Sequence, residues 1–191
     1  MDVSLVHLSK SFKEKIVLQD VNVTFLDGRI NCLMGASGVG KTTLLNILMG
    51  LLKPDSGKIL GAKGIRIGAV FQEDRLIEHL SAVDNIKLVC DKSVTVERMK
   101  EELRLVGILE DNNLPVKKFS GGMRRRVAIV RAILAKSELL IMDEPFKGLD
   151  EILKNQVIDY VKQRTIGKTV IIVTHDKEEI QQLEANVITL K

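Results

Sequence analysis

Residues 35–42 read Gly-Ala-Ser-Gly-Val-Gly-Lys-Thr, which is a glycine, four further residues and then Gly-Lys-Thr. The glycines allow the backbone to turn so that successive N–H groups point inward, and a helix opening at Lys41 adds its positive end to the same hollow. The run Ile30 to Met34 before this segment has the apolar character of a buried strand, and leucine and isoleucine recur at helical spacing after it. Strand, glycine loop and helix thus follow in the order that a phosphate-binding loop requires.

The individual residues of this loop have distinct expected roles. Lys41 is expected to bridge the β- and γ-phosphates of a nucleotide, and the Thr42 hydroxyl is expected to ligate the Mg²⁺ that neutralises their charge. The remaining residues expected to bind the nucleotide are Gly35, Ser37, Gly38, Val39, Gly40 and Thr43. The alternative is a glycine-rich turn without catalytic meaning, which the flanking strand and helix disfavour.

Short β-rich runs and helical patterns alternate along the chain. Residues 3–8 and 16–25 are typical of strands, and the apolar runs 65–71, 139–142 and 169–174 are separated by helical segments. Helices alternating with buried apolar strands indicate a largely parallel sheet covered on both faces. We therefore expect an α/β phosphate-loop NTPase fold, with a mostly parallel core sheet, an N-terminal antiparallel β-subdomain and an inserted helical subdomain.

The length of 191 residues suits one compact domain. Within it, residues 1–75 and 126–191 are expected to form the nucleotide-binding core. Residues 76–125 begin with a polar, helix-prone stretch without a strong β signal and are expected to form the inserted helical subdomain.

Composition limits the classes of protein. Apolar residues make up 45% of the chain, and no stretch approaches the roughly 18 consecutive apolar residues of a membrane-spanning helix. The first residues lack the pattern of a secretory signal, so a cytoplasmic location is expected. The net charge of +4 is mild, and one Tyr without any Trp argues against a stacking platform for single strands, so no nucleic-acid partner is expected. Cys32 and Cys90 have no metal-ligand spacing and are expected to be reduced packing residues.

Asp143 and Glu144 follow the apolar run 139–142, which places two carboxylates at the carboxyl end of a buried strand. Open α/β sheets bind their ligands at this end. Because adjacent strand residues point to opposite sides, we expect Asp143 to approach Mg²⁺ and Glu144 to face a different object, the water that attacks the γ-phosphate. The alternative is a solvated acidic turn, which a phosphate loop in the same domain disfavours.

The phosphate loop and the carboxylate pair, taken together with four further segments, resemble the motifs of the ATP-binding-cassette (ABC) ATPases. The resemblance covers essentially the whole chain. Residues 119–123, Phe-Ser-Gly-Gly-Met, resemble the signature loop that separates this family from other phosphate-loop proteins. Gln72 matches the glutamine loop of the family, residues 148–150 match its dimer-interface loop, and residues 174–176 match its switch-histidine segment. Residues 71–76 are further similar to importer ATPases of the nitrate, sulfonate, taurine and thiamine-precursor group.

The resemblance implies an ATPase in which two subunits enclose ATP and Mg²⁺. Ser120, Gly121 and Gly122 of one subunit are implied to close on the γ-phosphate that the phosphate loop of the other subunit holds. Hydrolysis then removes the contact that keeps the dimer shut. Asp150 is implied to organise this interface.

Three more side chains acquire implied roles. Gln72 is expected to sense Mg²⁺ and the attacking water, and His175 is expected to grip the γ-phosphate. Phe12 stands where the family places an aromatic residue that stacks on adenine. The alternative for Phe12 is a plain core residue. Met123 and Lys147 depart from the usual family residues, but neither departure removes a catalytic group.

The implied partners are separate membrane-spanning permease subunits and a second ATPase subunit, in a homodimer or a heterodimer. The chain is accordingly expected at the cytoplasmic face of the cell membrane, as the ATP-hydrolysing subunit of a transporter that works as an importer. Two other classes share part of the pattern. A soluble cassette protein acting on DNA or ribosomes usually carries long coiled coils or tandem cassettes, and a small-molecule kinase has no use for a signature loop.

Overall fold

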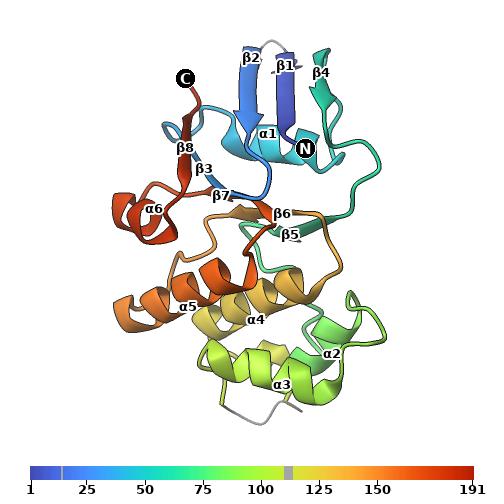
Figure 1. Ribbon diagram of the computed structural model, residues 1–191, viewed down its shortest axis with the longest axis vertical. Coiled ribbons are helices and arrows are strands. Elements are labelled where there is room, and N and C mark those ends of the chain that lie inside the picture. The colour runs from blue at the N-terminus through green and yellow to red at the C-terminus, as the bar shows by residue number, and fades with distance from the viewer. Residues whose placement is uncertain (14, 110–113) are drawn as a thin grey trace.

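The computed structural model describes residues 1–13, 15–109 and 114–191. Its strands are β1 (Val3–Phe12), β2 (Lys15–Phe25), β3 (Ile30–Met34), β4 (Ser56–Leu60), β5 (Ile67–Val70), β6 (Leu139–Asp143), β7 (Thr169–Val173) and β8 (Asn186–Thr189). Its helices are α1 (Lys41–Leu48), α2 (Ala82–Lys87), α3 (Val96–Leu105), α4 (Gly121–Leu134), α5 (Glu151–Arg164) and α6 (Lys177–Leu183), with a 3₁₀ turn, η1 (Val116–Lys118). Figure 1 shows an elongated molecule with an antiparallel sheet at one end and α2 and α3 at the other.

Two sheets organise the fold. The larger sheet has the order β5-β6-β7-β3-β8, and each of its neighbouring pairs is parallel. The smaller sheet has the order β2-β1-β4, and both of its pairs are antiparallel. The predicted combination of a parallel core sheet and an N-terminal antiparallel sheet is confirmed. Strand β4 was not among the expected strands, because Ser-Gly-Lys at its start lacks an apolar alternation and the strand forms by pairing with β1.

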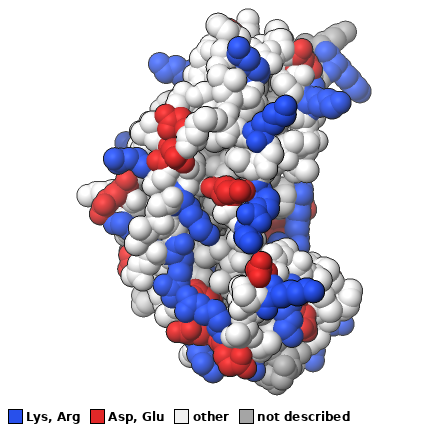
Figure 2. Space-filling view, turned by 45° about the vertical axis from the view of Figure 1, so that its right-hand side comes forward, with Lys and Arg blue, Asp and Glu red and all other residues white. Residues whose placement is uncertain are grey.

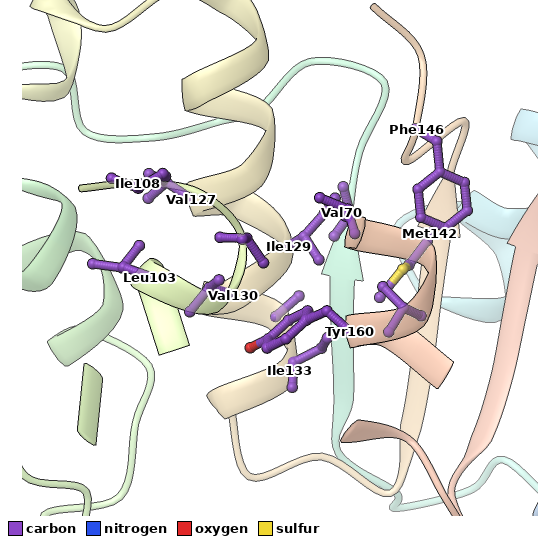
Figure 3. Packing of buried hydrophobic residues seen from close by; sticks show 14 of the residues in the cluster. Val70, Leu103, Ile108, Val127, Ile129, Val130, Ile133, Met142, Phe146 and Tyr160 are labelled. Carbon is purple, nitrogen blue, oxygen red and sulfur yellow. The ribbon is translucent and has the colours of Figure 1, made fainter. Parts of the chain in front are cut away.

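The parallel sheet lies between two apolar layers. In β6, Leu139 and Ile141 pack with α1 and the antiparallel sheet, whereas Leu140 and Met142 pack with α4 and α5. Successive strand side chains point to opposite faces, so a strand buried on both sides must be apolar throughout. Figure 3 shows residues of the second layer, which include Met142 of β6, Ile133 of α4 and Tyr160 of α5. The core thereby fixes the carboxyl end of β6 beside the amino end of α1.

The helices between β5 and the carboxyl half of α4 form a lobe below the sheet in Figure 1. Helix α4 begins at Gly121 and therefore crosses the expected boundary between residues 125 and 126. We retain the division into a core and an inserted helical subdomain as a proposal, with α4 shared by both.

In the described residues, no helix is both long enough and apolar enough to cross a membrane. On the face in Figure 2, basic side chains are interspersed with acidic ones.

Candidate functional site

The loop between β3 and α1 has the backbone that its glycines predict. Gly38 and Gly40 have φ angles of +79° and +104°, in the region that side chains other than glycine rarely adopt. A Cβ on Gly40 would lie 2.9 Å from the carbonyl oxygen of Val17 and 2.7 Å from a methyl of Leu18. Gly40 is also the residue before the first turn of α1, so the free N–H groups of that turn open into the loop.

The ammonium group of Lys41 is held inside this loop. Lys41 is only 7% exposed, and its Nζ donates to the carbonyl oxygens of Gly35 at 2.8 Å and Ala36 at 2.9 Å. A buried ammonium requires such acceptors. The loop therefore presents a fixed positive charge beside the N–H groups of α1, which together form an anion-binding site.

Thr42 and Asp143 are 101 positions apart in the sequence, but their side chains form a hydrogen bond. The Thr42 hydroxyl donates to Oδ2 of Asp143 at 3.0 Å. Burial raises the pKa of Asp143, with a further contribution from the negative charge of Glu144, while the hydrogen bond from Thr42 opposes this increase. A cation at this position would relieve the cost of burying the carboxylate.

These two oxygen atoms fit a hard cation that binds with a phosphate ligand. Mg²⁺ prefers oxygen ligands and is commonly held by one or two protein side chains together with phosphates and water. No group of three or more His, Cys, Asp or Glu side chains suited to a metal lies in residues 1–13, 15–109 or 114–191. The site therefore fits Mg²⁺ arriving with a nucleotide rather than a metal enclosed by the protein alone.

Glu144 does not continue the strand alternation. Strand β6 ends at Asp143, and Glu144 has a left-handed backbone with φ of +46°. Both carboxylates line the same pocket, so the strand alternation from which their separate roles were argued does not extend to Glu144. Their expected separate roles toward Mg²⁺ and the attacking water stay predictions. Left-handed backbone at a residue other than glycine is strained and clusters at functional sites.

The carboxylate of Glu144 has a basic side chain beside each of its oxygens. Lys147 Nζ lies 2.7 Å from Oε2, and Nε2 of His175 lies 3.4 Å from Oε1. The hydrogen bond from Lys147 lowers the pKa of Glu144, and burial partly offsets this effect. Glu144 is thus an ionised acceptor at neutral pH, with a hydrogen bond from Lys147 at one oxygen and His175 close to the other.

A pocket of about 270 Å³ brings these groups together. Its lining residues are Val17, Ser37, Gly38, Gly40, Lys41, Thr42, Thr43, Gln72, Asp143, Glu144, Val173 and His175. The predicted residues Gln72 and His175 thus lie with the phosphate loop and the carboxylate pair. Val17 and Val173 were missed, since an apolar residue in a strand gives no signal that distinguishes a pocket wall from the core.

Phe12 lies at the end of β1 and outside the lining of this pocket. Its side chain is 46% exposed, so the alternative of a plain core residue is wrong. The Nζ atom of Lys10 lies 5.5 Å from the centre of the Phe12 ring. Its role in stacking on adenine stays a prediction.

Other predicted residues lie at helix starts away from the pocket of their own chain. Ser120 is exposed and caps α4, with its hydroxyl accepting from the backbone N–H of Met123 at 3.2 Å. Gly121 and Gly122 form the first turn of that helix. Asp150 caps α5 by accepting from the N–H of Leu153 at 3.0 Å. All four stay predicted contacts to a second subunit.

The chain was compared with known families and proteins. The ABC transporter family profile matches residues 18–147. The taurine import ATP-binding protein TauB of Pelagibacter ubique is 37% identical over 85% of this chain and 66% of its own length. The spermidine/putrescine import ATP-binding protein PotA of Spiroplasma citri is 36% identical over 98% of this chain and 58% of its own length. The chain thus spans between about half and two thirds of these curated relatives.

A solved structure supports the same relationship. The bacterial ABC transporter cassette MJ0796, described as dimeric, has a TM-score of 0.86 and 30% identity over 99% of this chain and 94% of its own. A second structure of MJ0796 is described as a post-hydrolysis state bound to ADP and Pi. Since the family profile covers most of the sequence and the cassette fold covers nearly all of it, this chain belongs to the ABC transporter family.

Proposed function

We propose that this chain is the ATP-binding and ATP-hydrolysing subunit of an ABC importer, with transport carried out by separate permease subunits. The pocket carries the proposal, because Lys41 and Thr42 of the phosphate loop lie there with Asp143, the last residue of β6, and with Glu144 directly after it. A positive loop beside two carboxylates suits a triphosphate bound with a divalent cation. The import function is supported by the relatives named for taurine and for polyamine import.

Different residues are proposed to bind the phosphates, the Mg²⁺ and the adenine base. The N–H groups at the start of α1 and the ammonium of Lys41 bind the phosphates, and Lys41 exchanges its two carbonyl acceptors for phosphate oxygens. Thr42, Asp143 and Gln72 would hold Mg²⁺, which supplies positive charge to the β- and γ-phosphates when it is bound. Phe12 stacks on the adenine base.

Glu144 is the proposed general base of the hydrolysis reaction. Its ionised carboxylate faces the pocket and is oriented by Lys147 and His175, so it can accept a proton from a water molecule beside the γ-phosphate. His175 is 48% exposed in its side chain and can turn toward the phosphate. Hydrolysis is thus proposed to use positioning and charge already present in the fold.

The complete site is proposed to need two subunits. Ser120, Gly121 and Gly122 lie outside the pocket of their own chain, at the exposed start of α4, where free N–H groups favour an anion. The dimeric description of MJ0796 supports closure of this loop over ATP on a second subunit, identical or related. Coupling of dimer closure to permeases would place the chain at the cytoplasmic face of the membrane.

A comparison of two site variants tests the proposal. Lys41→Ala is expected to weaken ATP binding, because it removes the buried ammonium from the phosphate loop. Glu144→Gln is expected to keep ATP binding and to slow turnover by roughly 10²–10⁴, the usual scale for a general base. Equilibrium binding of ATP with Mg²⁺ and steady-state phosphate release separate the two effects.

Gel filtration of Glu144→Gln with ATP and Mg²⁺ tests the two-subunit site. Because the variant does not hydrolyse the shared γ-phosphate, we expect it to elute as a dimer with ATP and as a monomer without nucleotide. Glu97→Gln, at an exposed position in α3, is the matched control and should behave as the wild type. Wild-type turnover in Glu144→Gln would refute the assignment of the base, and binding of ATP without pairing would refute the two-subunit site.

A further inference from the structure

Arg125 of α4 is a buried arginine directed at backbone carbonyls. The residue is 5% exposed, although it lies only five positions after the exposed Ser120. Its guanidinium donates to carbonyl oxygens in two segments that are distant in sequence. These acceptors are the carbonyls of Phe71, Gln72, Asp143, Glu144 and Pro145.

Placing a guanidinium here is costly in free energy. Burial lowers the pKa of Arg125, although Asp74, whose Oδ1 lies 3.3 Å from Nη1, opposes this decrease. Most of its acceptors are neutral carbonyls rather than carboxylates, so the position is not explained as a simple ion pair. The hydrogen bonds instead fix the backbone of the two segments that supply Gln72 and the carboxylate pair.

The effect is concentrated on Glu144. Nη2 donates to the carbonyls of Asp143 and Glu144, the latter at 2.6 Å, and Nε donates to the carbonyl of Pro145 at 3.1 Å. Three consecutive carbonyls around the left-handed residue therefore accept from a single side chain. Because φ of +46° at Glu144 is strained, these hydrogen bonds stabilise the backbone conformation that turns its carboxylate into the pocket.

We propose that Arg125 is a positioning residue for hydrolysis, which holds the backbone of Glu144 and of the Gln72 segment in register with the helix that carries Ser120. The inference rests on the proposed function, because it assigns a partner to the base of that reaction. Movement of α4 is transmitted through this side chain to both segments. Closure of Ser120 on a nucleotide and the orientation of the base thereby become linked.

The geometry requires arginine rather than positive charge alone. A guanidinium has five N–H donors spread over three nitrogen atoms in one plane. An ammonium has three donors on a single nitrogen atom, so it cannot reach the carbonyls of residues 71–72 and of residues 143–145 at the same time. Arg126, the next residue in the helix, is buried to a similar extent at 6% exposed. Its hydrogen bonds go to carbonyls of Val106, Gly107 and Gly122, away from β6.

Two lysine variants provide the test. We expect Arg125→Lys to lower kcat by about tenfold or more, the scale of a misplaced catalytic group, while the Kd for ATP changes less than about threefold. Arg126 donates to the carbonyl of Gly122, so the control for kcat is Arg164→Lys of α5, whose side chain donates to Glu102, and its kcat should stay near the wild-type value. Equal kcat values in Arg125→Lys and Arg164→Lys would overturn the inference. Should Arg125→Lys not fold, Arg125→Gln, which removes the buried charge, is measured with the same expectations.

A double variant distinguishes positioning from a general loss of structure. In the Glu144→Gln background the base is already disabled, so Arg125→Lys should reduce single-turnover hydrolysis by less than about twofold. A further tenfold loss in that background would show that Arg125 acts mainly through groups other than Glu144, such as the Gln72 segment, contrary to the inference that its effect is concentrated on Glu144. If Glu144→Gln itself hydrolyses ATP at the wild-type rate, the proposed function fails first. If it is slow while Arg125→Lys is fast, only the role of Arg125 fails.

A measurement without turnover tests the same contact. Hydrogen exchange of peptides covering residues 143–147 and 71–75 should become faster in Arg125→Lys, because their carbonyl anchors are lost. Exchange in β3 should be unchanged, and Arg126→Lys should leave both peptides at the wild-type rate. Unchanged exchange at residues 143–147 in Arg125→Lys would contradict the proposed anchoring of Glu144.

Discussion

Two glycines in the phosphate loop permit a quantitative test of its close packing. Gly38 and Gly40 both have positive φ, at +79° and +104°, so alanine is strained at either position. A Cβ on Gly38 meets no described atom within 4 Å, whereas a Cβ on Gly40 lies within 3.0 Å of the carbonyl oxygen of Val17 and of a methyl of Leu18. Gly38→Ala therefore reports the backbone strain alone, and Gly40→Ala reports strain together with the clash.

The expected magnitudes follow from these contacts. The left-handed backbone costs about 1 kcal/mol for alanine at Gly38. At Gly40 the angle lies farther from the left-handed minimum, which costs about 2 kcal/mol, and displacing buried neighbours adds about 1–2 kcal/mol more. Leu18 is 2% exposed and the Val17 contact is a backbone atom, so neither moves freely. We expect Gly40→Ala to lower the free energy of unfolding by about 2–3 kcal/mol more than Gly38→Ala does.

Urea denaturation without nucleotide measures the difference. With a slope of about 2 kcal/mol per molar urea, Gly40→Ala should unfold at a midpoint about 1–1.5 M lower than Gly38→Ala. Gly50→Ala, with φ of +71° and no described atom within 4 Å of the added Cβ, is a control outside the loop and should match Gly38→Ala. Equal midpoints for the Gly38 and Gly40 variants would refute the argument from the close approach of β2.

Two further predictions concern ion pairs outside the pocket. Arg98 and Arg164 both contact the fully buried carboxylate of Glu102, so replacing the two arginines with Met should lower the free energy of unfolding by about 3 kcal/mol. Glu102→Met should cost less than about 1 kcal/mol, because the freed arginines are partly exposed, and urea midpoints showing the reverse order would contradict this reasoning. A hydrogen bond from Lys154 lowers the pKa of Asp176, so the carboxylate contributes stability above its unfolded pKa and loses it as the pH falls through the folded pKa. Lys154→Met should therefore lower the melting temperature slightly at neutral pH and leave it unchanged in acid below that pKa, and an equal decrease at both pH values would exclude the mechanism.

Local sequence was sufficient to predict several elements. The apolar run Ile30 to Met34 before the glycine loop predicted β3, and the structure has this strand at residues 30–34. A helical segment was expected between the apolar runs 139–142 and 169–174, and α5 occupies residues 151–164 of it, with Asp150 capping its start. By contrast, β4 was missed because a strand without alternation is defined by its partner, here β1.

The catalytic geometry depends on contacts that no local pattern contains. The types of the site residues were predicted from motifs, including Lys41, Gln72 and His175, and the structure places all three at one pocket. The left-handed backbone of Glu144 was not predicted, because Pro145 indicates that the strand ends there but favours an extended conformation at the residue before it. The guanidinium of Arg125, from a helix that precedes β6, stabilises that conformation.

By itself, the sequence determined the fold class, the order of most elements and the kind of chemistry, because hydrophobic periodicity, glycine positions and helix caps act over a few residues. Only the tertiary structure decided that Thr42 lies 3.0 Å from Asp143 and that both carboxylates share one pocket. Those arrangements depend on the order of strands in the parallel sheet and on the packing of helices against it. Side chains about a hundred residues apart are brought together by burial of the whole core, and no short segment carries that information.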